Sequence, residues 1–178
     1  MNDVVLNAEG VHEAIERICQ EICEQERGNK LAIVGIRHGG EVLAKRVATR
    51  IEQLLDCEVP VGFVDITLYR DDGFGRAEWP EVGVTEIPFN PTESIVVLVD
   101  DVLFTGRTVR AALDAILDYG RPPAIRAAVL VDRGLRELPI RADFVGIQLT
   151  TEHDQHVRVN LTNAEEDDIV VVSVRTKQ

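Results

Sequence analysis

Apolar residues recur along this chain at the spacing of amphipathic helices, in three separate stretches. In the first stretch they recur every three or four residues from Val11 to Ile22, and Gly28 follows as a stop signal. The three stretches are residues 8–27, 43–55 and 109–116. The pattern therefore predicts three helices, each with one face directed at a core.

Short apolar runs separate these stretches and predict strands. They are residues 31–36, 61–68, 95–99, 125–131, 144–149, 157–161 and 169–174. The run Ile95–Val99 is wholly apolar and rich in β-branched residues, which is typical of a central strand in a parallel sheet. The alternation predicts an α/β fold with a parallel sheet flanked by helices, and the closely spaced last runs predict an antiparallel C-terminal edge. No repeat or linker divides the chain, so we expect residues 1–178 to form one domain.

The polar segment 70–94 is unusually long for a loop inside a compact domain. It contains three glycines, three prolines and Trp79. Loops of this length persist when they have a function or hide a hairpin. We therefore expect a flexible flap here, and a plain surface hairpin is the alternative.

Charge and cysteine content narrow the class of protein. The net charge of −12 disfavours a dedicated non-specific nucleic-acid binder, which is usually basic. An odd count of three cysteines argues against a disulfide framework, and Cys19 and Cys23 lack a second pair at metal-site spacing. No apolar run could span a bilayer and no secretion signal is evident, so we expect a soluble, cytoplasmic protein.

The segment after the run Ile95–Val99 carries the strongest chemical signal. Asp100 and Asp101 follow this strand directly, and the turn Thr105–Thr108 then opens a helix. Ligands of parallel sheets bind at the carboxyl ends of strands, and free amides at a helix N-terminus bind phosphate. Two carboxylates suit ribose hydroxyls, so the segment predicts a sugar-phosphate site. In the alternative, a threonine caps the helix and the acids are a solvated strand end.

Other phosphate-binding motifs are absent from the sequence. No GxxxxGK[ST] pattern occurs, and Gly35, Gly39 and Gly40 do not have the spacing of a dinucleotide-binding GxGxxG loop. ATPase and dinucleotide-binding functions are therefore disfavoured.

The segment Val97–Val109 resembles the phosphoribosyl-pyrophosphate (PRPP) signature of the type I phosphoribosyltransferases. With the blocks Asp65–Asp72 and Val129–Asp143, the chain is similar over nearly its whole length to a bifunctional family. Members of that family are pyrimidine-operon attenuation regulators with uracil phosphoribosyltransferase activity. The resemblance implies a type I phosphoribosyltransferase fold and the reaction of uracil with PRPP to give UMP and pyrophosphate.

The resemblance also implies roles for individual residues. The catalytic residues would be Asp100 and Asp101, at the ribose hydroxyls, and Arg70, where the flap begins. The 5′-phosphate would be bound by Val102, Leu103, Phe104, Thr105, Gly106, Arg107 and Thr108. Pyrophosphate would be bound by Arg37, His38, Gly39 and Gly40, in a loop with a strained cis peptide, and uracil would face Val131, Asp132, Arg133 and Gly134. Mg²⁺ would be held mainly through the substrate rather than by a protein metal site.

Two positions in this pattern bear on the chemistry. Purine-using relatives commonly carry an acid where this chain has Phe104, which agrees with a pyrimidine acceptor. Relatives usually have Thr-Arg-Gly in the pyrophosphate loop, where this chain has His38, Gly39 and Gly40. The lost arginine puts full activity of the loop in question.

Regulatory members of the family bind a leader-transcript hairpin in the presence of UMP. The candidate RNA-binding residues here are Arg17, Lys45, Arg46 and Arg50, but the first helix also carries six glutamates. Three alternatives therefore stay open: a regulator with little catalysis, a phosphoribosyltransferase without an RNA role, and an unrelated sugar-phosphate binder. The resemblance further implies a homo-oligomer, a dimer or larger.

Overall fold

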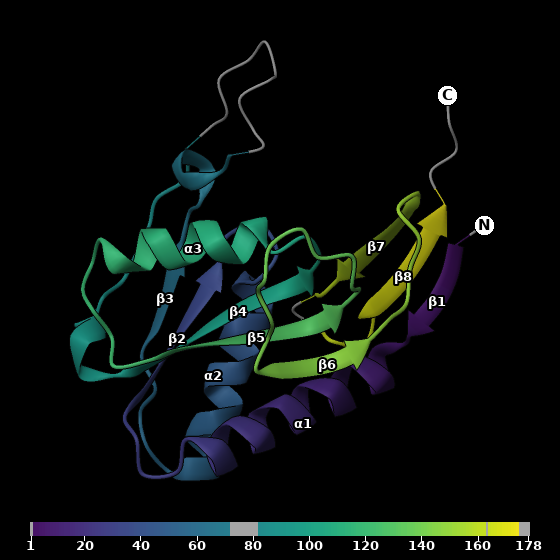
Figure 1. The fold of residues 1–178 in the computed structure, drawn as a ribbon. Coiled ribbons are helices and arrows are strands. Elements are labelled where there is room, and N and C mark those ends of the chain that lie inside the picture. Colours follow the sequence, from purple (N-terminus) through teal and green to yellow (C-terminus); the bar gives the residue numbers. More distant parts are fainter. Residues whose placement is uncertain (1, 72–81, 163, 175–178) are drawn as a thin grey trace.

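A central parallel sheet organises the chain, as the computed structural model shows for residues 2–71, 82–162 and 164–174 (Figure 1). Its five strands have the order β3-β2-β4-β5-β6, and every neighbouring pair is parallel. The strands are β2 (Leu31–Ile36), β3 (Val61–Val64), β4 (Ile95–Leu103), β5 (Ile125–Asp132) and β6 (Phe144–Gln148). The predicted α/β class is confirmed, and β4 is the central strand expected from its apolar sequence.

Helices cover both faces of this sheet (Figure 1). They are α1 (Ala8–Gln25), α2 (Glu41–Leu55) and α3 (Arg107–Leu117). The buried faces of α1 and α2 pack with one side of the sheet, and the buried face of α3 packs with the other side. At the start of α1 the Asn7 side chain accepts a hydrogen bond from the Gly10 amide at 3.0 Å, an N-cap. The three predicted helices are therefore all present.

A second, antiparallel sheet lies beside the first and joins the two ends of the chain (Figure 1). Its order is β1-β8-β7, with β1 (Asn2–Leu6), β7 (Gln155–Asn160) and β8 (Ile169–Val174). The predicted antiparallel C-terminal edge is thus confirmed, although it forms a separate sheet and β6 pairs in parallel with β5. Strand β1 was not predicted.

The chain leaves β3 earlier than the apolar pattern predicts. The carboxylate of Asp65 accepts a hydrogen bond from the Thr67 amide at 3.0 Å, and this turn leads into a 3₁₀-helix, η1 (Thr67–Tyr69). The predicted flap begins beyond it, and its residues 72–81, including Trp79, lie outside the described residues. The chain then returns along β3, where Glu86 and Phe63 exchange backbone hydrogen bonds of 2.7 and 2.8 Å, and continues through η2 (Pro91–Glu93).

All three cysteines have free thiols. Cys19 is buried in α1, and burial raises the pKa of its thiol to about 12. Such a thiol is unreactive, as expected for a small core residue. None of the helices in the described ranges is long and apolar enough to cross a membrane.

Candidate active site

Two adjacent carboxylates lie at the carboxyl end of the central strand. Asp100 still pairs with β5, so β4 carries its regular geometry into the acids. Gly39 faces both side chains: a Cβ added there would lie 2.7 Å from Asp101 Oδ1 and 3.1 Å from Asp100 Oδ1. The two carboxylates therefore converge on one point above the Gly39 backbone.

The environment of these acids disfavours their charged forms. Asp100 is only 6% exposed, and its pKa is raised well above the usual range by burial and then by the charge of Asp101. The positive charge of Arg70 lowers it in part. Burial also raises the pKa of Asp101. A cationic ligand or a set of hydroxyl donors would relieve this unfavourable burial.

The loop after β2 passes very close to the acids. The Gly40 amide donates to the Ile36 carbonyl at 2.8 Å, and a Cβ on Gly40 would collide with the Val99 carbonyl oxygen. His38 has φ of 73°, in the left-handed region, and its Nε2 lies 3.9 Å from Asp65 Oδ2. The cis peptide bond that the resemblance implied is absent, since the described residues contain none. The backbone strain of this loop lies at His38 instead.

Arg37 is directed toward the segment that returns along β3. Its guanidinium contacts Glu41 at 2.6 Å, Glu86 at 3.4 Å and the Val84 carbonyl at 2.5 Å. The side chain that could replace the missing loop arginine is therefore already bound by two carboxylates.

A hollow, which we call the phosphate hollow, opens at the N-terminus of α3. It has a volume of about 270 Å³ and is lined by all seven residues expected to bind the 5′-phosphate, Val102 to Thr108, together with Arg70 and Glu137. Gly106 has φ of 93°, which favours glycine, and the Thr105 hydroxyl accepts from the Arg107 amide at 3.4 Å. The first amides of α3 are thus presented at a turn that can bind an anion.

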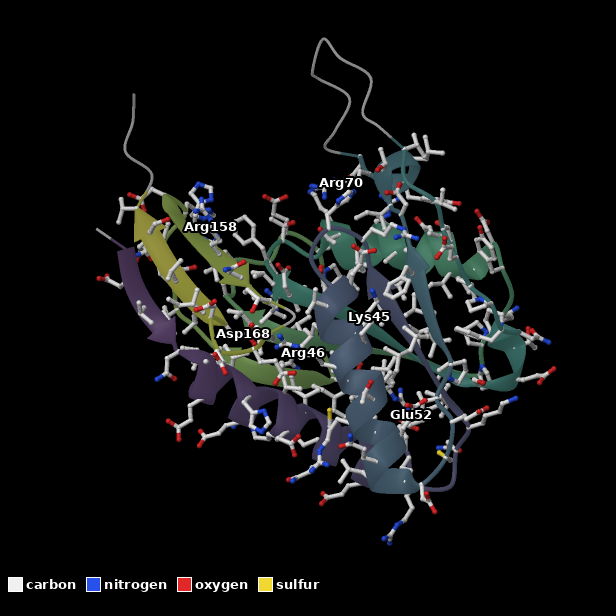
Figure 2. The ribbon with its side chains drawn as sticks, turned by 180° about the vertical axis from the view of Figure 1, so that it is seen from behind. Lys45, Arg46, Glu52, Arg70, Arg158 and Asp168 are labelled. Carbon is white, nitrogen blue, oxygen red and sulfur yellow. The ribbon has the colours of Figure 1, made fainter. Side chains whose placement is uncertain are left out.

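A second hollow, which we call the acid hollow, shares a wall with the phosphate hollow. The acid hollow, about 330 Å³, is lined by Asp100 and Asp101 and by the loop residues Arg37, His38 and Gly39. Arg70, Val102 and Thr108 line both hollows. Figure 2 shows Arg70 at this edge of the molecule, on the segment that follows η1. One elongated ligand could therefore occupy both hollows, with a phosphate at one end and hydroxyl groups at the acids.

Arg107 connects the phosphate hollow to two acids that the sequence did not single out. Its guanidinium lies 2.6 Å from Asp71 and 2.8 Å from Glu137. Both acids fall inside the sequence blocks that carried the resemblance, but only their positions in space reveal the contact.

The stretch expected to face uracil lies beside the phosphate turn, but its side chains are engaged within the protein. Val131 is buried, and the Asp132 carboxylate accepts from Arg136 at 2.5 Å and from the Gly134 amide at 2.9 Å. The Arg133 guanidinium lies 4.0 Å from the centre of the Phe104 ring, and burial lowers its pKa. None of the four residues lines either hollow.

Arg136 joins this stretch to the phosphate turn. Besides Asp132, it donates to the carbonyl oxygens of Phe104 at 2.7 Å, Gly134 at 3.0 Å and Ile140 at 3.0 Å. With Asp71 and Glu137, it is the third residue that the sequence patterns did not predict.

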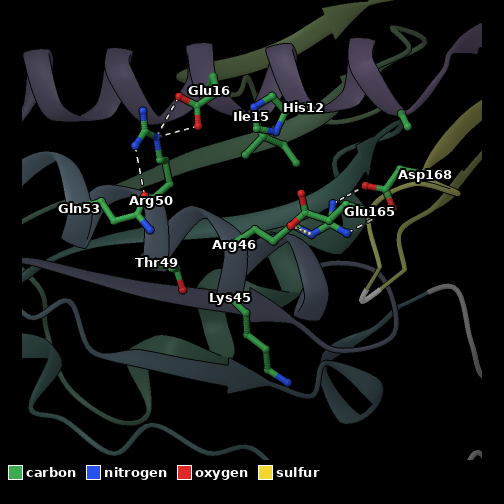
Figure 3. A pocket seen from close by; sticks show the side chains of 11 residues that line it. His12, Ile15, Glu16, Lys45, Arg46, Thr49, Arg50, Gln53, Glu165 and Asp168 are labelled. Carbon is green, nitrogen blue, oxygen red and sulfur yellow. Dashed lines mark hydrogen bonds and ion pairs between the residues drawn. The ribbon is translucent and has the colours of Figure 1, made fainter.

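Three of the four candidate RNA-binding residues line a different groove, of about 320 Å³, between α1, α2 and the loop before β8 (Figure 3). Arg46 is bound by Asp168 and by the Thr162 carbonyl, and Arg50 lies 2.7 Å from Glu16. The Lys45 ammonium lies 5.4 Å from the centre of the Phe63 ring and extends away from these arginines (Figure 3). The groove therefore carries balanced charges.

Arg17, the fourth candidate, donates to the Gly146 carbonyl, so its guanidinium is also engaged within the protein.

Side chains that could bind a metal ion do not gather in one place in the part of the chain that the structure describes. No cluster of three or more His, Cys, Asp or Glu side chains forms there. The convergent pair Asp100–Asp101 fits a hard cation such as Mg²⁺ that takes its other oxygens from substrate and water.

Comparison with known proteins decides the family. Residues 2–166 match the phosphoribosyl transferase domain. The chain belongs to the phosphoribosyltransferase family. Among relatives of this phosphoribosyltransferase, the bifunctional protein PyrR of Geobacter sulfurreducens is 55% identical over 157 residues, which cover 88% of the chain and 89% of that protein. The bifunctional protein PyrR of Pelotomaculum thermopropionicum is 51% identical over 169 residues, covering 94% and 93%.

Solved structures of more distant proteins share the fold of this phosphoribosyltransferase. A hypoxanthine phosphoribosyltransferase of Trypanosoma cruzi has a TM-score of 0.70 at 16% identity, covering 96% of this chain and 91% of that chain. A hypoxanthine-guanine phosphoribosyltransferase of Bacillus anthracis has a TM-score of 0.66 at 20% identity, covering 83% of both chains.

Proposed function

We propose that this protein is a uracil phosphoribosyltransferase, which converts uracil and PRPP to UMP and pyrophosphate, and that it also regulates pyrimidine genes. The observation that carries the enzymatic proposal is the shared wall between the acid hollow and the phosphate hollow. The similarity to bifunctional PyrR proteins supports the same assignment.

The donor would lie across both hollows. Its 5′-phosphate accepts hydrogen bonds from the amides and hydroxyls of Thr105–Thr108, and its ribose hydroxyls donate to Asp100 and Asp101. The pyrophosphate extends toward Gly39, where the absence of a side chain leaves the two carboxylates uncovered, whereas Gly40 packs against the Val99 carbonyl and lines neither hollow. Mg²⁺, when bound, neutralises charge on the leaving pyrophosphate and on the carboxylates.

During the reaction the bond between C1 of the ribose and the pyrophosphate oxygen breaks, and N1 of uracil forms the new bond to C1. The N1 proton passes to the departing pyrophosphate or to water, and positive charge develops on the ribose ring in the transition state. The carboxylates of Asp100 and Asp101 stabilise this charge, and Arg70 stabilises the leaving group. Burial raises the pKa of Asp100, so its charged form depends on a nearby cation such as Arg70 or bound Mg²⁺; once charged, it is little screened by water.

Uracil would be bound between the phosphate turn and the stretch 131–134. The Asp132 carboxylate is already engaged, so we assign recognition to the backbone of this stretch and to the Phe104 ring. Phe104 offers no carboxylate as a base toward a purine, which favours the pyrimidine.

An assay of UMP formation from uracil, PRPP and Mg²⁺ tests the enzymatic proposal. We expect product with uracil and none with hypoxanthine or guanine. Failure with all three bases would favour a sugar-phosphate binder without this activity.

The regulatory function rests on the similarity to bifunctional PyrR proteins, and we propose that it consists of UMP-dependent binding to a leader-mRNA hairpin. Lys45 is our first candidate for an RNA contact. Arg17, Arg46 and Arg50 would have to exchange their present partners for phosphates. The measurement is salt-dependent hairpin binding with and without UMP; Lys45→Gln should weaken it, whereas the distant Lys30→Gln serves as a matched control. An oligomer, which we also expect, would add a second copy of this surface.

A further inference from the structure

The segment that precedes the flap is fastened along α3. The Tyr69 hydroxyl donates to Asp118 at 2.5 Å, just beyond the C-terminal end of this helix. Arg110, in the first turns of α3, donates to the Tyr69 carbonyl at 3.4 Å. The backbone on one side of Arg70 is therefore held by two contacts to the same helix.

The residue on the other side of Arg70 is held by the same helix. The Asp71 carboxylate lies 2.6 Å from Arg107 and 3.6 Å from Arg110. Arg107 is the first residue of α3 and lines the phosphate hollow. Asp71 therefore connects the start of the flap directly to the turn that would bind the 5′-phosphate.

Arg70, between these two anchored residues, lines both hollows. An arginine has many rotamers, so its usefulness at a reacting centre depends on a fixed backbone and on restricted side-chain freedom. Asp71 itself lines neither hollow, so it would not touch the substrate.

We propose that Asp71 is a positioning residue, whose ion pairs with Arg107 and Arg110 hold Arg70 at the junction of the acid and phosphate hollows. This inference rests on the proposed phosphoribosyltransferase function. The two carboxylate–arginine contacts are partly exposed, with Asp71 at 42% and Arg107 at 32%, so they contribute little to folding. Their role is instead to fix where the Arg70 backbone lies.

The chain offers a matched control for this role. Asp114 lies 2.9 Å from Arg110, on the same helix and at a similar exposure of 49%, and it is not among the ion-pair partners of Arg107 in the described residues, which are Asp71 and Glu137. Asp71→Asn and Asp114→Asn each remove one carboxylate partner of Arg110, but only Asp71→Asn also removes the ion pair between Arg107 and the residue next to Arg70.

Steady-state kinetics of the full-length variants test the proposal. We expect Asp71→Asn to lower kcat about tenfold with an unchanged KM for uracil, because Arg70 acts on the leaving group in the transition state. Asp71→Glu, which keeps the carboxylate, should retain most of the wild-type kcat, and Asp114→Asn should retain all of it. Thermal unfolding of each variant should match that of the wild type.

A double-mutant cycle tests whether Asp71 acts through Arg70. In an Arg70→Gln background, Asp71→Asn should lower kcat no further. Additive losses, a kcat of Asp71→Asn within twofold of the wild type, or an equal loss in Asp114→Asn would each overturn the inference. A wild-type protein that forms no UMP would instead overturn the proposed function, and the inference with it.

Discussion

Two aspartates that are buried to a similar extent, Asp168 and Asp100, have opposite electrostatic surroundings. Asp168, on the loop before β8, is 4% exposed, and Asp100, near the end of β4, is 6% exposed. Asp168 is bound by Arg46 through two contacts and accepts from the Thr162 amide at 2.8 Å (Figures 2 and 3). Asp100 has another carboxylate, Asp101, as its neighbour, and its pKa is raised by burial and by that neighbour.

The difference separates a structural charge from a functional one. The Arg46–Asp168 pair joins α2 to the antiparallel sheet, and each charge is neutralised by the other without a ligand. The pair Asp100–Asp101 is unfavourable without a ligand, which is typical of a site that recovers this free energy on binding.

The largest effect should follow from removal of the structural charge. Asp168→Ala leaves the buried Arg46 with only the longer, more exposed carboxylate contact, to Glu165 at 3.6 Å, and we expect a loss of about 3 kcal/mol of unfolding free energy. Denaturant unfolding measures it. Glu16→Ala removes the partner of Arg50 from a more exposed ion pair, and the unfolding free energy should fall by less than about 1 kcal/mol. Equal losses in the two variants would show that burial does not distinguish these pairs.

Removal of a functional charge should have the opposite effect on stability. Asp101→Asn should lower the rate of UMP formation roughly 100-fold or more, because a charge opposite the developing positive ribose is lost. Its melting temperature should rise, since an amide replaces a carboxyl group whose burial is unfavourable. A variant that lost both activity and stability would contradict this account of the acids.

The loop beside the acids should tolerate side chains unequally. At Gly40 an added Cβ would meet backbone, including the Ile36 amide nitrogen at 2.9 Å, whereas at Gly39 it would meet the ends of aspartate side chains. We expect Gly40→Ala to lose about 1–3 kcal/mol of stability. Gly39→Ala should lose less, because Asp101 can rotate away. Melting curves of the two variants give the ranking.

The smallest effect concerns pH. Because the folded-state pKa of Asp100 is raised, its contribution to stability is fully present below its unfolded pKa and is lost as pH rises through the folded pKa. The wild type should therefore lose stability relative to Asp100→Asn as the pH rises above about 4, the unfolded pKa of an aspartate. Urea unfolding of both proteins across this range measures the difference, and a constant difference would refute it.

The sequence predicted most elements of the fold because their apolar patterns are local. Strand β1 escaped prediction, since its short run Val4–Leu6 becomes a strand only by pairing with β8 at the other end of the chain. Strand β4 extends beyond the predicted Val99, because Asp100 and Val102 still pair with β5 although the apolar pattern has ended.

The candidate site was predictable where its residues are neighbours in sequence, as in Val102–Thr108. Asp71, Glu137 and Arg136 were not predicted as parts of it, because their contacts join segments about thirty residues or more away along the chain. Conversely, Arg46 and Arg50 were predicted as candidate RNA-binding residues, but in the folded protein they form ion pairs with Asp168 and Glu16.

The structure of this protein with bound UMP would test the central claim most directly. The account predicts the 5′-phosphate at the amides of Gly106–Thr108 and the ribose hydroxyls within hydrogen-bond distance of Asp100 and Asp101. A nucleotide bound elsewhere, for example in the groove beside Arg46 and Arg50, with the acids left without contact, would contradict it.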